Sequence, residues 1–221
     1  MMSKRFARLF SEQDRTAIAA AITQAEGRTA GEIVPYVVTQ SDDYEIATWR
    51  GGMFALLVLL TALLLVRWYS SHWLELGFLA TAMLVLAAQG TGMLAVHFLP
   101  PLKRFFAGAR LIEQRVGQRA AVAFLDEEIF RTRERTGILI FLSLLEHKVI
   151  VLGDAGINAK VQQAEWDEVV RLLTEGMRAG APAQALIRAI KKCGELLERQ
   201  GVSPRPDDTS ELSDKLRFTD R

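Results

Sequence analysis

Two long apolar stretches dominate the pattern of hydrophobic and polar positions in the first half of the chain. The first has no ionisable residue from Gly51 to Val66 and extends to residue 69, and the second runs from Leu74 to Leu99. The first approaches and the second exceeds the roughly 20 residues that an α-helix needs to cross the hydrocarbon core of a bilayer. Because only residues 70–73 separate them, the pattern predicts two antiparallel helices that form a transmembrane hairpin.

A pair of buried helices in a soluble protein is the alternative interpretation of these stretches. Buried helices usually keep a polar stripe, which these stretches lack, so we favour the membrane interpretation. Lys103, Arg104, Arg50 and Arg110 flank the outer ends of the hairpin, whereas its tip carries Arg67 alone. By the positive-inside rule, this asymmetry predicts a multi-pass protein of the inner (cytoplasmic) membrane, with both termini and the soluble domain in the cytoplasm.

The sequence before the hairpin contains one helical pattern and one strand pattern. Apolar residues recur at helical spacing from Ser11, which forms a candidate capping box with Asp14, to Gly27. β-Branched residues then mark a strand over 32–39, in which Pro35 indicates an edge position or a bulge. Residues 1–48 are therefore expected to form the first part of a soluble domain.

The sequence after the hairpin supplies the remaining elements of that domain. In chain order, we expect a helix from Ala109 to about Arg133, strands over 138–143 and 148–152, a short helix over 157–161, and two amphipathic helices separated by Gly180. The first strand, a crossover helix and the second strand predict a parallel pair, and the later β-hairpin adds an antiparallel member.

The predicted fold class is therefore α/β, a small mixed sheet sandwiched between helices. The transmembrane hairpin of residues 49–101 is inserted between residues 1–48 and 102–201 of the soluble domain. Residues 202–221 begin with a Pro-rich, acidic segment that has little to bury, so we expect an extended tail.

Charge and cysteine content narrow the class of partner. The chain has 27 Lys and Arg against 26 Asp and Glu, a formal net charge of +1, which offers no field to attract nucleic acid. A single cysteine, Cys193, cannot form an internal disulfide and favours a reducing compartment. The N-terminus lacks the pattern of a cleavable signal peptide. The expected partners are the lipid bilayer and other membrane proteins.

Several segments of the soluble sequence, taken in order, resemble the TPM domain, a family named for thylakoid and related membrane proteins. The matching segments are residues 29–34, residues 147–157, Trp166, residues 193–197, residues 205–208 and residues 211–212. The resemblance implies a small sheet between helices that is attached to a membrane. It also implies one of three activities found among relatives: acid phosphatase, calcium binding, or an accessory role in membrane complexes. The chain departs from the family pattern because its membrane segments lie inside the domain.

Acidic residues that follow two of the predicted strands form the candidate metal site. Asp42 and Asp43 follow the first strand, and Asp154 follows the third, with Asn158 one helical turn later. Ca²⁺ and Mg²⁺ prefer such carboxylate and amide oxygens, provided that both strands point the same way. The alternative is that Asp42 and Asp43 are solvated linker residues and that Asp154 caps the next helix.

Two functions remain open from the sequence. It contains no Walker loop, no Gly-x-Ser-x-Gly elbow, no paired cysteine ligands and no His-Glu-x-x-His, so we cannot assign catalytic residues. The absence of these motifs favours a non-catalytic binding or accessory module for membrane protein assemblies. The alternative is a metal-dependent acid phosphatase at the membrane surface, which requires Asp42 or Asp43 to converge with Asp154.

Overall fold

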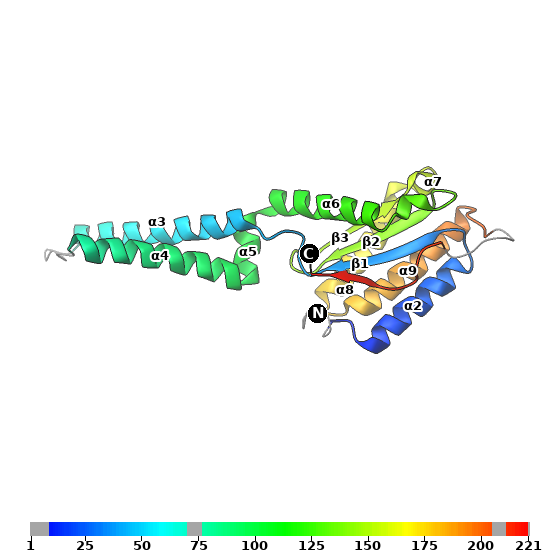
Figure 1. The fold of residues 1–221 in the computed structure, drawn as a ribbon, viewed down its shortest axis with the longest axis horizontal. Helices are drawn as coiled ribbons and strands as arrows, with labels where there is room; N and C mark the ends of the chain where they lie inside the picture. The colour runs from blue at the N-terminus through cyan, green and yellow to red at the C-terminus, as the bar shows by residue number, and fades with distance from the viewer. Residues whose placement is uncertain (1–8, 70–76, 205–210, 221) are drawn as a thin grey trace. The chain divides into compact units, whose positions relative to one another are not determined.

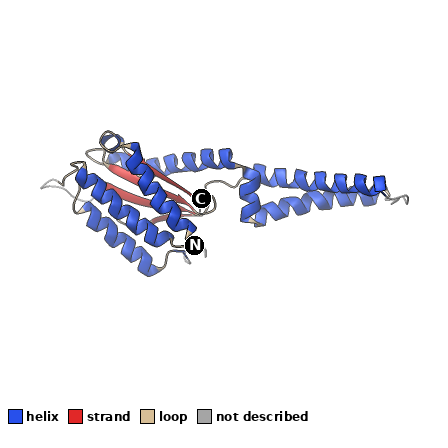
Figure 2. Cartoon of the chain, turned by 180° about the vertical axis from the view of Figure 1, so that it is seen from behind, coloured by secondary structure: helices blue, strands red, loops and turns tan. Residues whose placement is uncertain are grey.

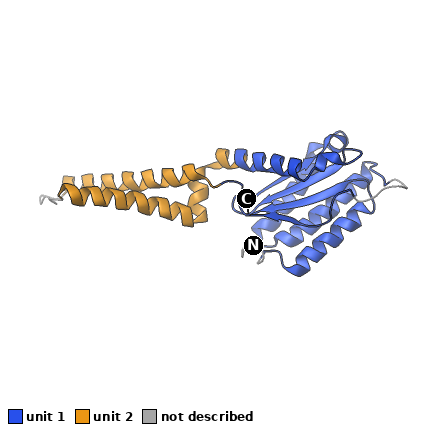
Figure 3. Ribbon diagram, viewed as in Figure 1, with its two compact units in different colours: residues 1–42, 114–221 blue, residues 43–113 orange. Residues whose placement is uncertain are grey.

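The computed structural model describes residues 9–69, 77–204 and 211–220, and its chain divides into two compact units (Figure 3). The α/β unit comprises Met1–Asp42 and Gln114–Arg221, and the helical unit comprises Asp43–Glu113. The helical unit contains both apolar stretches, so the two parts of the α/β unit come from opposite sides of them in the sequence.

A four-stranded mixed sheet forms the centre of the α/β unit. The strands are β1 (Glu32–Val38), β2 (Gly137–Ser143), β3 (Lys148–Gly153) and β4 (Arg217–Thr219), arranged in the order β3-β2-β1-β4. β1 runs parallel to β2 and β4, whereas β2 and β3 form an antiparallel hairpin. The predicted parallel pair with an antiparallel addition is therefore confirmed.

Helices cover both faces of this sheet. One face carries α6 (Ala109–Asp126), and the other carries α2 (Glu12–Glu26), α8 (Gln163–Arg178) and α9 (Pro182–Arg199), as Figures 1 and 2 show from opposite sides. All residues of β1 and β2 are buried, as expected for strands that are covered on both faces. Inward residues of these strands, such as Ile33 and Ile140, join the apolar faces of α2, α8 and α9 in the main core.

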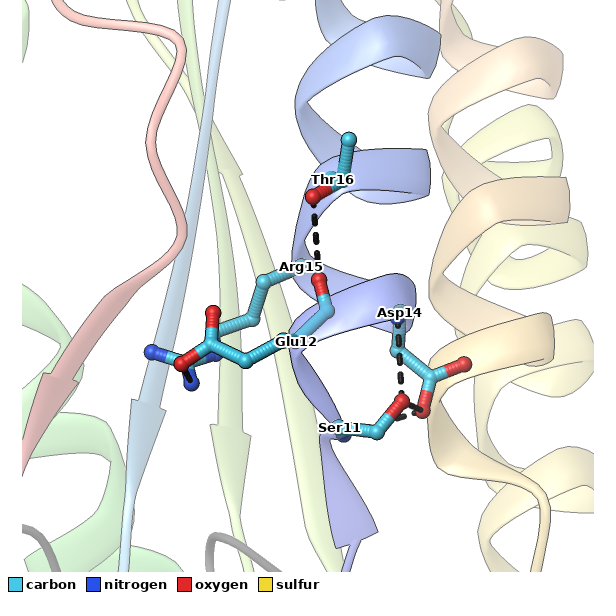
Figure 4. Close-up of polar contacts among 5 residues, drawn as sticks. All are labelled: Ser11, Glu12, Asp14, Arg15 and Thr16. Atoms are coloured by element: carbon cyan, nitrogen blue, oxygen red, sulfur yellow. Dashed lines mark hydrogen bonds and ion pairs between the residues drawn. The ribbon is translucent and has the colours of Figure 1, made fainter.

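The N-terminus of α2 confirms the predicted capping box (Figure 4). The backbone N–H of Asp14 donates to the Ser11 hydroxyl at 3.1 Å, and the Ser11 N–H donates to the Asp14 carboxylate at 3.0 Å. One turn into the helix, the Thr16 hydroxyl donates to the backbone carbonyl of Glu12 at 3.0 Å. The two bonds between Ser11 and Asp14 use backbone N–H groups that a helix N-terminus otherwise leaves without partners.

The helix that begins at Ala109 ends earlier than the expected Arg133. α6 stops at Asp126 because Glu128 adopts a left-handed backbone conformation, with φ at 53°, which an α-helix cannot contain. A short 3₁₀ turn, η1 (Ile129–Arg131), then leads into β2. Past β3, α7 (Ala155–Asn158) is the short helix expected there, and it begins slightly earlier than predicted.

The C-terminal segment differs most from its prediction as an extended tail. Residues Arg217–Thr219 of this segment form β4, which pairs with Tyr36, Val37 and Val38 of β1. β1 is therefore an internal strand, which corrects the predicted edge position of Pro35. The pairing with β4 does not reach Pro35, whose partner in the sheet is Ile140 of β2. A proline without a backbone N–H fits a position that only one neighbouring strand pairs.

The helical unit consists of two long helices and a shorter one. They are α3 (Glu45–Tyr69), α4 (Phe78–Phe98) and α5 (Pro100–Ala107). α3 contains the predicted span from Gly51 to Val66 and begins upstream of it. α4 ends before Leu99, as predicted from the two prolines, whereas the predicted start at Leu74 lies outside the described residues. α5 was not predicted.

Candidate functional site

The most prominent surface of the chain is the exposed apolar surface of α3 and α4. Both helices are long and apolar enough to cross a bilayer, and only 11% and 6% of their most apolar stretches are buried. Large exposed side chains include Leu57, Leu64 and Leu65 on α3 and Phe78, Leu79, Met83 and Leu86 on α4. A core helix of a soluble protein would be mostly buried, so this exposure supports membrane association.

Glycines allow α3 and α4 to pack closely against each other. A Cβ atom added to Gly92 would lie 2.6 Å from both the carbonyl oxygen of Gly51 and the Cβ of Ala55. One added to Gly51 would lie 2.2 Å from a methyl group of Val96. Such close backbone approach through small residues is how apolar helices associate where no hydrophobic force drives them together.

The structure separates the acidic residues that the sequence grouped into one site. The carboxyl end of β1, which precedes Asp42 and Asp43, lies beside Ser143 and the start of β3. Asp154 follows β3 at the opposite end of the sheet, where its backbone N–H donates to the carbonyl of Gly137. The condition for a shared site, that both strands point the same way, is therefore contradicted.

Asp42 and Asp154 form separate interactions instead. A carboxylate oxygen of Asp42 lies 2.7 Å from the guanidinium Nε of Arg115 on α6. Asp154 is buried, accepts from the N–H of Ala155 at 2.7 Å as the N-cap of α7, and pairs with Arg135 at 2.7 Å. The alternative role of Asp154 as a helix cap is therefore confirmed.

Asn158 lies near Asp154 and stabilises the same turn. Its side-chain amide donates to the carbonyl of Gly153 at 2.6 Å, which links α7 back to the end of β3. Across the described parts of the chain, no three His, Cys, Asp or Glu side chains are arranged to hold a metal ion. The strands that precede Asp42 and Asp154 run in opposite directions, so the convergence that the phosphatase alternative requires is not supported by the sheet topology.

A polar network at the carboxyl ends of β1 and β2 was missed in the sequence. Glu146 is buried and accepts from the backbone N–H of Ser41 at 2.8 Å and from the hydroxyl of Ser143. The Ser41 and Ser143 hydroxyls lie 2.8 Å apart. The carboxyl ends of parallel strands commonly bind ligands, but here the polar groups bond to one another and fix the loop after β1.

Two glutamates near the amino end of β1, Glu26 and Glu32, form a second polar cluster that the sequence did not reveal. Glu26 accepts a hydrogen bond from the backbone N–H of Ile33 at 2.8 Å. Burial raises the pKa of Glu26 to about 8. The bond from Ile33 opposes this rise, and the nearby charges of Glu32 and Asp214 add to it. Burial likewise raises the pKa of Glu32, which accepts from the N–H groups of Glu211 and Leu212. Glu32 therefore links the C-terminal segment to the start of β1.

Comparison with known proteins identifies one similar fold. No family model matches the chain, and no curated protein matches its sequence. The NMR structure of the BA42 protein from the psychrophilic bacterium Bizionia argentinensis matches with a TM-score of 0.57 and 18% sequence identity, over 95% of each chain. At this identity the likeness shows a shared fold and carries no function over to this chain.

Proposed function

We propose that this chain is an integral membrane protein whose TPM-like α/β unit serves as a non-catalytic binding or accessory module for other membrane proteins. The observation that carries this proposal is the uncovered apolar surface along both α3 and α4. A soluble chain would have to hold that surface in water at a large free-energy cost, whereas a bilayer covers it.

Basic residues support the proposed topology. Arg50 lies at the start of the apolar part of α3, and Lys103 and Arg104 lie on α5 directly after α4. The positive-inside rule places these ends at the cytoplasmic face of the inner membrane. The α/β unit is connected to the helical unit at these same ends of α3 and α4, so it lies in the cytoplasm.

The polar networks of the α/β unit support binding in preference to catalysis. The carboxylates of Glu146 and Asp154 already accept hydrogen bonds from neighbouring groups, and the predicted acidic residues lie at opposite ends of the sheet. The TPM family, which the sequence resembles, includes members with accessory roles and members that bind calcium. We therefore keep a divalent cation, Ca²⁺ or Mg²⁺, as a possible ligand of this module and assign it no ligand set.

Two exposed apolar residues indicate where a partner contacts the α/β unit. Val122 and Leu125 lie on α6 and are 45% and 61% exposed, although most of the large apolar residues described in this unit are buried. They lie three positions apart, so they share one face of the helix. An apolar face on a domain held beside the membrane fits contact with another membrane protein.

Site-specific photocrosslinking in native membranes tests this proposal. A photoreactive amino acid at Leu125 should form a discrete crosslink to a membrane protein, and Leu125→Asp should abolish co-purification of that protein. The same amino acid at the exposed Arg188 of α9 is the matched control. The proposal fails if position 125 crosslinks no more than position 188, with the chain still integrated in the membrane.

A further inference from the structure

α5 is held firmly at one end of the α3/α4 hairpin. The ring centroids of Phe106 on α5 and Phe54 on α3 lie 5.7 Å apart. The Arg50 guanidinium donates to the carbonyl of Phe106 at 2.9 Å and to that of Ala107 at 3.2 Å, so it caps the C-terminus of α5. α5 is therefore an ordered helix placed level with the first turns of α3.

The eight residues of α5 have an apolar side and a basic side. Leu102, Phe105 and Phe106 share one side of the helix by their spacing, and Lys103 and Arg104 fall on the other. Phe106 packs against the hairpin, whereas Phe105 beside it is 75% exposed. Phe98, the last residue of α4, is also exposed.

The charge at the α5 end of the helical unit is mainly basic, although Glu45 lies in the first turn of α3 at the same end. Between Glu45 and Glu113, the sequence contains a single acidic residue, Glu75, which lies between α3 and α4 in the sequence. Arg50, Lys103, Arg104 and Arg110 all lie in or beside the α5 end of the helical unit. An exposed aromatic ring beside clustered basic residues, at the end of two apolar helices, complements a negatively charged lipid surface.

We propose that α5 lies in the headgroup layer and binds anionic phospholipids. Phe105 inserts between acyl chains, while Lys103 and Arg104 extend their charged ends to lipid phosphates. Arg50 holds the helix in this position through its C-terminal carbonyls. This inference rests on the proposed insertion of α3 and α4 into a bilayer, and it adds a preference for a chemical class of lipid at one defined end of the hairpin.

Lipid-specific quenching of a fluorophore on α5 tests this proposal. In a Cys193→Ala background, Phe105→Cys is labelled with a small apolar fluorophore, and the full chain is reconstituted into phosphatidylcholine vesicles. Quencher-bearing phosphatidylglycerol and phosphatidylcholine, identical in their acyl chains, are then compared. Phe78→Cys, at the opposite end of the hairpin and 89% exposed in the native chain, is labelled as the matched control.

We expect phosphatidylglycerol to quench the position 105 label several-fold more effectively than phosphatidylcholine, since each basic residue near the surface adds about fivefold to the attraction. Lys103→Gln/Arg104→Gln should abolish that preference, and about 1 M salt should weaken it by screening. Neither change should alter quenching at position 78.

The outcomes separate this inference from the function on which it rests. Equal quenching at position 105 by the two lipids, with normal quenching at position 78, would overturn the lipid preference and leave membrane insertion standing. Quenching at neither position would contradict insertion itself. Strong quenching at 105 with no dependence on Lys103 and Arg104 would show that apolar contact alone places α5, and would also overturn the proposal.

Discussion

At the scale of single residues, local signals were predictable and long-range contacts were not. The Ser11 capping box and the Asp154 cap depend on residues within three positions of each other, so the sequence displays them directly. Glu32 contacts Glu211 across 179 positions, and a strand-end glutamate in the sequence gives no sign of that contact. The raised pKa of Glu26 was equally unpredictable, because its burial beside Glu32 and Asp214 exists only in the folded chain.

Glu26 should make the α/β unit less stable as pH rises. Its carboxyl group has an ordinary pKa of 4.5 and a folded pKa of about 8. The unfolded chain therefore releases this proton at lower pH than the folded chain does. Stability due to the protonated group is fully present below 4.5 and is lost as pH rises through about 8. Burial of Glu32 adds a loss of the same sign.

Thermal unfolding of the detergent-solubilised chain across this pH window measures the effect. Glu26→Gln cannot ionise and keeps an acceptor for the Ile33 N–H, so its midpoint should fall less with rising pH than that of the native chain. Glu175→Gln, at an exposed position on α8, should leave the native pH profile unchanged. Parallel profiles for the native chain and Glu26→Gln would contradict the assignment.

Asp154 should act as a helix cap and an ion-pair partner, independently of Asp42. Asp154→Ala removes the acceptor for the Ala155 N–H and should lower the free energy of unfolding by about 0.5–2 kcal/mol, whereas Asp154→Asn should retain most of the cap. Calorimetric titration with Ca²⁺ and Mg²⁺ provides the second measurement. If the native chain bound a cation and both Asp154→Ala and Asp42→Ala/Asp43→Ala abolished that binding equally, the result would contradict the separation of Asp154 from Asp42 and Asp43.

At the scale of elements, periodicity located most helices and strands, and backbone conformation set the ends that it missed. The end of α6 depends on the left-handed conformation of Glu128, for which its side chain gives no signal. Pro100 and Pro101 correctly ended α4, but the same prolines also occupy the first turn of α5, where their missing N–H groups are tolerated. The two prolines therefore end one helix and begin the next, and only the first role was predicted.

The separation of the acidic residues follows from topology that the sequence did predict. A parallel β1–β2 pair followed by a β2–β3 hairpin makes β3 antiparallel to β1. The carboxyl ends of β1 and β3 therefore lie at opposite ends of the sheet, and so do the residues that follow these strands. β4 was unpredictable because three residues give too short a pattern to distinguish a strand from a tail.

Close packing of α3 against α4 should depend on Gly92 and not on Gly90. A methyl group at Gly92 would meet the Gly51 carbonyl and Ala55, whereas one at Gly90 has no atom within 4 Å. Gly92→Ala should therefore increase the distance between spin labels placed at Leu57 and Leu86. Gly90→Ala makes the same chemical change on the same helix and should leave that distance unchanged. Equal distances in both variants would contradict glycine-mediated packing.

At the scale of the whole molecule, the sequence predicted the two-helix hairpin most clearly. Sixteen residues from Gly51 to Val66 without a single ionisable group form a pattern that few soluble helices show, and the structure leaves these helices uncovered. The function of the α/β unit is harder to predict because its polar residues serve the fold. At the carboxyl ends of β1 and β2, where a parallel sheet usually binds a ligand, hydrogen bonds instead join Ser41, Ser143 and Glu146.

Alkaline carbonate extraction of membranes from cells that produce the full chain tests the central claim most directly. High pH releases proteins that bind a membrane through charge or through other proteins, whereas chains with inserted apolar helices stay with the lipid. We predict that the chain remains in the membrane pellet. Its release into the supernatant with soluble proteins would contradict the transmembrane hairpin and, with it, the proposed role of this protein at the membrane.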